Sequence, residues 1–150
     1  LDPVRSDNFD ASFEWYYDKG SFVSVAAFMK NIDTTIFRDP IPTSREINDE
    51  VFSVTTFGNF GGTKLKGIEL RAAHAFTYLP GLLRHLGVTG NFTYIDEKSD
   101  LRDQEGDPIG RRGLSNYTYN AGAYYDDKKI NLRLAYNWRS EFTRREIVQL

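Results

Sequence analysis

The stretch DNFDASFEWYYDKGS, residues 7–21, decides the fold class of this chain. Up to residue 17 its odd positions are mostly apolar or aromatic, as at Phe9 and Trp15, and its even positions are mostly polar. This period of two is typical of a β-strand with one apolar and one polar face. The turn sequence DKGS at residues 18–21 predicts a hairpin with a returning strand at residues 22–32. The alternation of that returning strand is too irregular to assign its faces.

The same alternation recurs along the rest of the chain, and the connections between strands are short, long, short, long and short. The first long connection begins with residues 33–50, which are polar, contain Pro40 and Pro42, and are predicted to form a loop. A β-prone segment follows at residues 51–57 and is broken by residues 58–62, and the role of residues 51–60 stays unassigned. The second long connection covers residues 96–113. The predicted fold is all-β, an antiparallel up-and-down meander. Its six principal strands of about ten residues are residues 7–17, 22–32, 64–78, 88–94, 115–125 and 130–139.

The apolar faces of these strands carry aromatic side chains near their ends, as at Trp15, Tyr78 and Trp138. Such rings suit the boundary between lipid and water. A membrane-spanning strand needs roughly 9–11 residues, and short turns on one side with long loops on the other are typical of outer-membrane barrels. The strands therefore predict a transmembrane sheet, although a soluble antiparallel sheet explains each strand alone equally well.

Six strands are too few to enclose a pore, and open sheet edges are costly in lipid because their backbone groups lack partners. We therefore expect a partial transmembrane β-barrel. The chain begins without a signal peptide and ends at residues 147–150 without a terminal aromatic residue. Both features favour a truncated or internal piece of a longer protein.

The composition argues against several other classes of function. The chain has 150 residues, a formal net charge of −2 and no Cys, so it shows no marker of nucleic-acid binding and has no disulfide or thiolate chemistry. His74 and His85 are its only histidines, and they show no metal-binding spacing. There is no phosphate-binding loop and no nucleophile elbow. We therefore expect no enzyme activity, no cofactor and no metal.

Several motifs, taken in order, resemble the TonB-dependent receptors. SDNFDASFEWYY at residues 6–17 is similar to a barrel strand of that family, and GGTKLKGIEL at residues 61–70 resembles its GG-x-x-x-x-GIEL strand. LPGLL at residues 79–83 and NFTY at residues 91–94 resemble the turn and strand that come next. LAYNWR at residues 134–139 resembles part of a later hairpin of the family.

The resemblance implies that residues 1–150 are about six principal strands of a 22-stranded barrel that surrounds a plug. It also implies that the plug, the signal peptide and the last strands are absent from this sequence. The family takes up large, scarce solutes across the bacterial outer membrane, such as a siderophore, cobalamin or an oligosaccharide. The partners implied are outer-membrane lipid, an extracellular small solute and the TonB complex, the last through a missing N-terminal part. A passive porin wall and a soluble β-rich binding module stay open as alternatives.

By this topology the long connections at residues 33–62 and 96–113 face the outside and meet the solute first. Aromatic and cationic side chains in them are the candidate ligand-binding residues. They are Phe37, Arg38, Arg45, Phe52, Phe57, Phe60, Arg102, Arg111 and Arg112.

Overall fold

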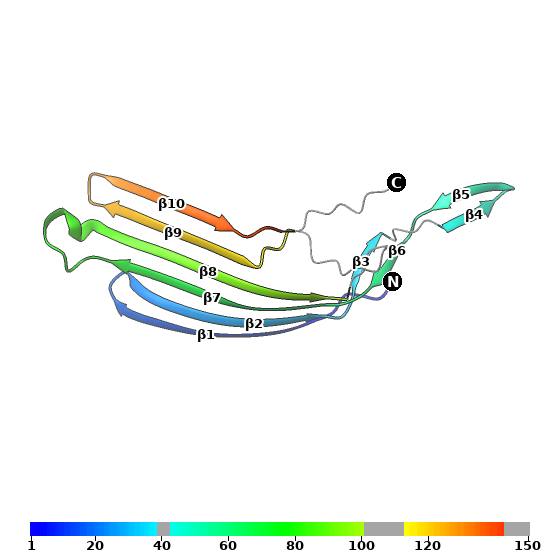
Figure 1. The fold of residues 1–150 in the computed structure, drawn as a ribbon, viewed down its shortest axis with the longest axis horizontal. Coiled ribbons are helices and arrows are strands. Elements are labelled where there is room, and N and C mark those ends of the chain that lie inside the picture. Colours follow the sequence, from blue (N-terminus) through cyan, green and yellow to red (C-terminus); the bar gives the residue numbers. More distant parts are fainter. Residues whose placement is uncertain (39–42, 101–112, 143–150) are drawn as a thin grey trace.

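The protein is described from a computed structural model, which covers residues 1–38, 43–100 and 113–142. Its main feature is one antiparallel sheet of six strands in the order β1-β2-β7-β8-β9-β10 (Figure 1). Strands that are neighbours in the sheet also follow one another along the chain, except that residues 33–62 lie between β2 and β7. We call residues 33–62 the excursion. This order confirms the predicted meander. The strands are β1 (Ser6–Asp18), β2 (Ser21–Ile32), β7 (Thr63–Ala75), β8 (Leu86–Ser99), β9 (Tyr117–Asp126) and β10 (Asn131–Arg139).

The three short connections lie at one end of the sheet, and the long ones leave from the other (Figure 1). We call these the turn end and the loop end. The β7–β8 connection contains a short 3₁₀-helix, η1 (Gly81–His85). β7 ends at Ala75, before the predicted residue 78, and β8 continues to Ser99, into the predicted loop. The physical reason is that β8 pairs with β7 along its whole length, from Gly87 opposite Ala75 to Ser99 opposite Thr63.

The prediction that residues 33–50 form a loop is wrong. β3 (Thr35–Arg38) pairs with β6 (Phe57–Phe60), and β4 (Thr43–Ile47) pairs with β5 (Glu50–Val54). Both pairs extend away from the loop end of the main sheet (Figure 1). In the β4–β5 turn Asn48 has a φ of 53° and Asp49 a φ of 63°. These are the left-handed conformations of a two-residue hairpin turn. Asn and Asp adopt these angles more readily than most residues, so the pair was a sequence signal for this hairpin.

The main sheet is a single layer with no core of the usual kind. Among the described residues Ile32 is the only buried hydrophobic side chain, at 7% exposure, whereas Leu134 is 75% and Phe13 68% exposed. A soluble sheet buries one face against a second layer. This sheet has no second layer in the described part of the chain, so both faces must be matched by their surroundings.

The register of the strands settles the faces of β2. Cross-strand partners point to the same side of a sheet. Val25 lies between Phe13 and Leu70, and Val23 lies between Trp15 and Ala72. The odd positions of β2 therefore share the apolar face of the sheet, and its even positions share the polar face.

In the described residues no helix is long and apolar enough to cross a membrane.

Candidate functional site

Each of the six strands contributes one hydrogen-bonding side chain to a single line across the polar face. These residues are direct cross-strand partners, so their side chains follow one another at the strand spacing of about 4.8 Å. We call this line the polar row. It consists of Glu14, Ser24, Arg71, Asn91, Asn120 and Asn137.

Contacts on the polar face hold several members of the polar row in place. The Asn120 side-chain amide donates a hydrogen bond to Oδ1 of Asn91 at 2.6 Å. The Arg71 guanidinium donates to the Glu69 carboxylate at 2.9 Å, and this ion pair is exposed. In the part of the chain that the structure describes, Asn137 has no side-chain hydrogen bond. The row thus combines oriented amides with donors that remain available.

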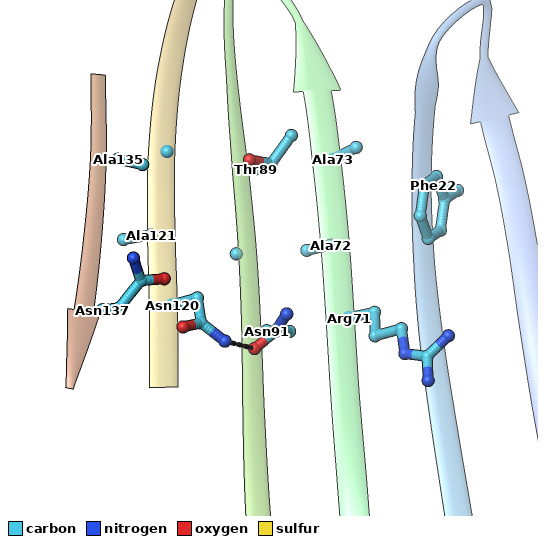
Figure 2. Close-up of a pocket in the computed structure, with 12 residues that line it drawn as sticks. Phe22, Arg71, Ala72, Ala73, Thr89, Asn91, Asn120, Ala121, Ala135 and Asn137 are labelled. Carbon is cyan, nitrogen blue, oxygen red and sulfur yellow. Dashed lines mark hydrogen bonds between the residues drawn. The ribbon is translucent and has the colours of Figure 1, made fainter. Parts of the chain in front are cut away.

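A line of small side chains lies beside the polar row, one step toward the turn end. Ala73, Thr89, Gly122 and Ala135 are cross-strand partners in this line, and Phe22 continues it on β2. Because these side chains are short, the polar row borders an open groove of about 290 Å³. Figure 2 shows Arg71, Asn91, Asn120 and Asn137 along it, with Phe22 at its β2 end.

Two aromatic rings on the polar face lie over glycines of the neighbouring strand. Phe28 covers Gly67, where an added Cβ would lie 2.5 Å from the Phe28 ring. Tyr124 covers Gly87 in the same way, and no side chain other than hydrogen fits beneath its ring. These two glycines let large rings lie flat on the sheet, so the groove between them stays open.

The apolar face is continuous across all six strands. One row of cross-strand partners crosses the sheet from β1 to β10. Its members, in order, are Phe13, Val25, Leu70, Phe92, Tyr119 and Trp138. These side chains are half-buried to exposed, and together they form a continuous apolar face of a kind that soluble monomers rarely expose. Such a patch requires an apolar partner.

Aromatic side chains bound the apolar face at the turn end. The rings of Trp15 and Tyr17 lie 5.2 Å apart, and Tyr17 stacks on His74 at 5.9 Å. The Tyr17 hydroxyl hydrogen-bonds to Nδ1 of His74 at 3.0 Å, and the Tyr78 hydroxyl lies 3.5 Å from its Nε2. His74 is therefore a hydrogen-bonded member of an aromatic cluster, and no group of metal-ligating side chains is found in the described residues.

A second aromatic band lies toward the loop end. Tyr119 stacks on Trp138 with ring centroids 5.0 Å apart, and the Tyr94 and Tyr117 rings are also 5.0 Å apart. β9 has 10 residues, so its two ends lie about 30 Å apart at ~3.3 Å per residue. At a strand tilt of about 40° this length spans roughly 23 Å, close to the height of about 25 Å of the apolar band of an outer-membrane barrel.

The structure separates the candidate ligand-binding residues predicted from the sequence. Phe37 and Arg38 lie on β3, where their backbones pair with Gly58 and Phe57 of β6. Arg45 lies opposite Phe52 near the β4–β5 turn. The remaining cationic candidates, Arg102, Arg111 and Arg112, lie outside the described residues.

The loop candidates do not converge on one pocket in the described part of the chain. Phe57 and Phe52 are exposed, at 62% and 44%, and Phe60 lies opposite Thr35 at the base of the excursion. The sequence-based reasoning missed the polar row as a site. The alternation had placed Arg71, Asn91 and Asn137 on polar faces, but the row exists only through the register of the strands.

One apolar face between two aromatic bands, opposite a polar face with a groove, defines a segment of the wall of a transmembrane β-barrel. The family model described as TonB dependent receptor-like, beta-barrel matches residues 1–147. The chain therefore belongs to this family of bacterial outer-membrane receptors and transporters, which is not an enzyme family. Searches among curated proteins and among solved structures gave no match.

The family membership confirms the predicted fold class, a partial barrel built from an antiparallel meander. It also identifies the two media. The apolar face belongs against lipid, and the polar face, with its groove, belongs against the interior of the barrel. Within the described residues the outer edges of β1 and β10 have no strand partner, as expected for part of a larger barrel wall.

Proposed function

We propose that this chain forms part of the wall of an active transporter in the bacterial outer membrane. The transporter takes up a large, scarce solute, such as a siderophore, cobalamin or an oligosaccharide, and TonB energises the uptake. In this proposal residues 1–150 belong to a barrel of about 22 strands. The plug and the segment that engages TonB lie elsewhere in the full-length receptor.

The observation that carries the proposal is the polar row beside its groove on the interior face. A solute that moves along a barrel wall exchanges hydrogen bonds with water for hydrogen bonds with the wall. Asn91 and Asn120 each offer both donor and acceptor atoms, and Arg71 adds a fixed fork of donors. Successive weak contacts at about 4.8 Å spacing guide a polar solute without trapping it, since each such hydrogen bond has a net value of only about 1 kcal/mol.

The loop residues complete the proposed path. The β3–β6 and β4–β5 pairs extend beyond the loop end, which faces the outside in barrels of this type (Figure 1). In this proposal the Phe57 ring, which is exposed, and the cationic Arg45 on these pairs meet a solute before it reaches the polar row. In this proposal the solute first contacts the excursion and then passes along the interior face.

Uptake by cells that express the full-length receptor tests the proposal. The probes are a ferric hydroxamate siderophore, cyanocobalamin and maltoheptaose, each compared with cells that lack the receptor. We expect one probe to accumulate above the receptor-free level, and we expect a protonophore to abolish that accumulation. Accumulation that persists with the protonophore would establish a passive pore, and no accumulation of any probe would exclude the proposed solute classes.

The role of the polar row is tested with the double substitution Asn91→Ala and Asn120→Ala in the same cells. We expect the uptake rate to fall by roughly tenfold, because two side chains with net hydrogen-bond values of about 0.5–1.5 kcal/mol are lost. Asn31→Ala is the matched control, because Asn31 is an exposed amide on the opposite face of the sheet. An equal loss in the control, or none in the double variant, contradicts a role of this row in passage.

A further inference from the structure

Two lysines face one another at the loop end of the apolar face. Lys64 of β7 and Lys98 of β8 are direct cross-strand partners, and both are exposed. They lie on the same side as the Ile68–Tyr94 pair, which belongs to the lipid-facing surface. The strand sequence therefore places two cations together on the outside of the barrel, just beyond the apolar band.

The depth of this lysine pair matches the headgroup region of the membrane. Along β8, Lys98 lies about 13 Å beyond Tyr94 of the loop-end aromatic band, at ~3.3 Å per residue. A strand tilt of about 40° converts this into roughly 10 Å above the band. The long, flexible lysine stems allow the ammonium groups to adjust to the level of the headgroups.

The charges around the pair leave both lysines without a carboxylate partner in the described residues. Lys66, the next residue on this face of β7, is already paired with Asp96 at 3.3 Å. Asp7 lies in the same row as the pair but two strands away from Lys64, about 10 Å across the sheet. Asp100 follows β8, and it forms no ion pair with either lysine in the part of the chain described.

Like charges that lie directly opposite one another destabilise a sheet unless an anion neutralises them. The chain as a whole is slightly acidic, with a net charge of −2, so this basic pair is not a reflection of its overall charge. The pair faces the membrane, where the available anions are headgroups. Neutralisation by a group of the bilayer thus explains both the pairing and its position.

We propose that Lys64 and Lys98 bind a phosphate group of a lipid headgroup in the outer leaflet. Two ammonium groups supply six N–H donors to the phosphate oxygens, and charge-assisted hydrogen bonds of this kind are stronger than neutral ones. The proposed site anchors the β7–β8 wall at one depth in the membrane. It depends on the membrane-facing surface of the barrel and not on the identity of the solute.

The experiment uses the purified full-length receptor in phosphatidylcholine vesicles that contain diphosphorylated lipid A, with native mass spectrometry to count bound lipid A. The test variant carries Lys64→Gln and Lys98→Gln. The matched control is Lys30→Gln, because Lys30 is exposed on the adjacent strand next to Leu65 but on the interior face. We expect the affinity for lipid A to fall by roughly tenfold or more in the test variant and to stay unchanged in the control.

Three further measurements test whether the two lysine charges bind the phosphate group of the lipid. Lys64→Arg with Lys98→Arg keeps both charges, so it should retain binding and show that the barrel still folds. Dephosphorylated lipid A should bind the unaltered receptor as weakly as diphosphorylated lipid A binds the Gln variant. Inorganic phosphate at millimolar concentration should compete poorly. Unchanged binding in the Gln variant, equal binding of the dephosphorylated lipid, or full competition by inorganic phosphate would each overturn the proposal.

Discussion

The two faces of the six-stranded sheet are held by different physics although they share one backbone. On the apolar face, side chains such as Leu134 and Phe13 have few protein neighbours, and their burial is completed by lipid. On the polar face, Asn91 and Asn120 are joined by a hydrogen bond beside an open groove. This sheet is therefore stabilised by the difference between its two media rather than by a core of its own.

The largest expected effect comes from placing a charge on the lipid-facing side. Leu134→Arg in the full-length receptor should lower the free energy of unfolding by about 2–4 kcal/mol, because a cation near the middle of the bilayer is poorly solvated. Ala135→Arg is the matched control on the next residue of β10, which borders the interior groove. Urea unfolding of the receptor in lipid vesicles measures both.

If the two faces meet different media, the losses of unfolding free energy in the two arginine variants should differ by more than about 1.5 kcal/mol. Equal losses would mean that the surrounding medium does not distinguish the faces. A greater loss from Ala135→Arg would reverse the assignment of lipid and interior.

A smaller effect is expected where the polar face is packed most closely. Gly67→Ala places a methyl group 2.5 Å from the Phe28 ring and against the Tyr94 carbonyl, so it should lower the unfolding free energy by about 1–3 kcal/mol. Gly90→Ala is the control on the apolar face, because its nearest new contact is the Asn120 carbonyl oxygen at 3.7 Å. The control should change stability by less than about 0.5 kcal/mol.

Urea unfolding in vesicles again provides the measurement. If Gly67→Ala were tolerated as well as Gly90→Ala, the Phe28 ring would not be fixed on the sheet as the structure places it. The polar face would then be held by its hydrogen bonds alone.

The smallest effect is expected in the β9–β10 turn, which belongs to neither face. Asp127 accepts hydrogen bonds from the backbone N–H groups of Lys129 and Ile130, each at 2.7 Å, and from the Tyr125 hydroxyl at 2.9 Å. The two backbone donors, followed by the Tyr125 hydroxyl, hold the pKa of the Asp127 carboxyl below its usual range. The ionised form is therefore the one that the folded turn prefers.

The pKa of Asp127 in the folded turn lies below the unfolded value of about 3.9. The ionised Asp127 carboxylate therefore stabilises the folded turn above pH 4, and this stabilisation is lost as the pH falls through the folded pKa. We expect Asp127→Ala to lower the amide protection of Lys129 and Ile130 at neutral pH. Acidification should do the same in the unaltered turn, after correction for intrinsic exchange rates. Asp126→Ala serves as the neighbouring control. Hydrogen exchange on the full-length receptor should show no loss of amide protection at Lys129 and Ile130 in this control.

The sequence determined the features that depend on neighbouring residues in the chain. The alternation around Trp15 and around Leu134 predicted strands with one apolar face, and DKGS at residues 18–21 predicted a tight turn. These predictions were confirmed because side chains of a strand alternate from side to side whatever the strand pairs with. The fold class and the order of the six strands followed from the same local pattern.

Local features that were missed had weaker signals. The hairpin at Asn48 and Asp49 was read as loop because its strands are short and polar. The faces of β2 stayed unassigned because Phe22 and Phe28 are as apolar as the residues on the other side. Phe28 lies on the interior side because it covers Gly67, a contact with a strand that is distant in the sequence.

The pairing of the strands, by contrast, determines which polar residues meet. Arg71, Asn91, Asn120 and Asn137 come from four strands, and Lys64 and Lys98 from two of these. A shift of one strand by two residues preserves every face, yet it separates these partners, so alternation alone does not specify the rows. Local periodicity therefore fixed the sides of the sheet, and the long-range register of backbone hydrogen bonds fixed the polar row and the lysine pair.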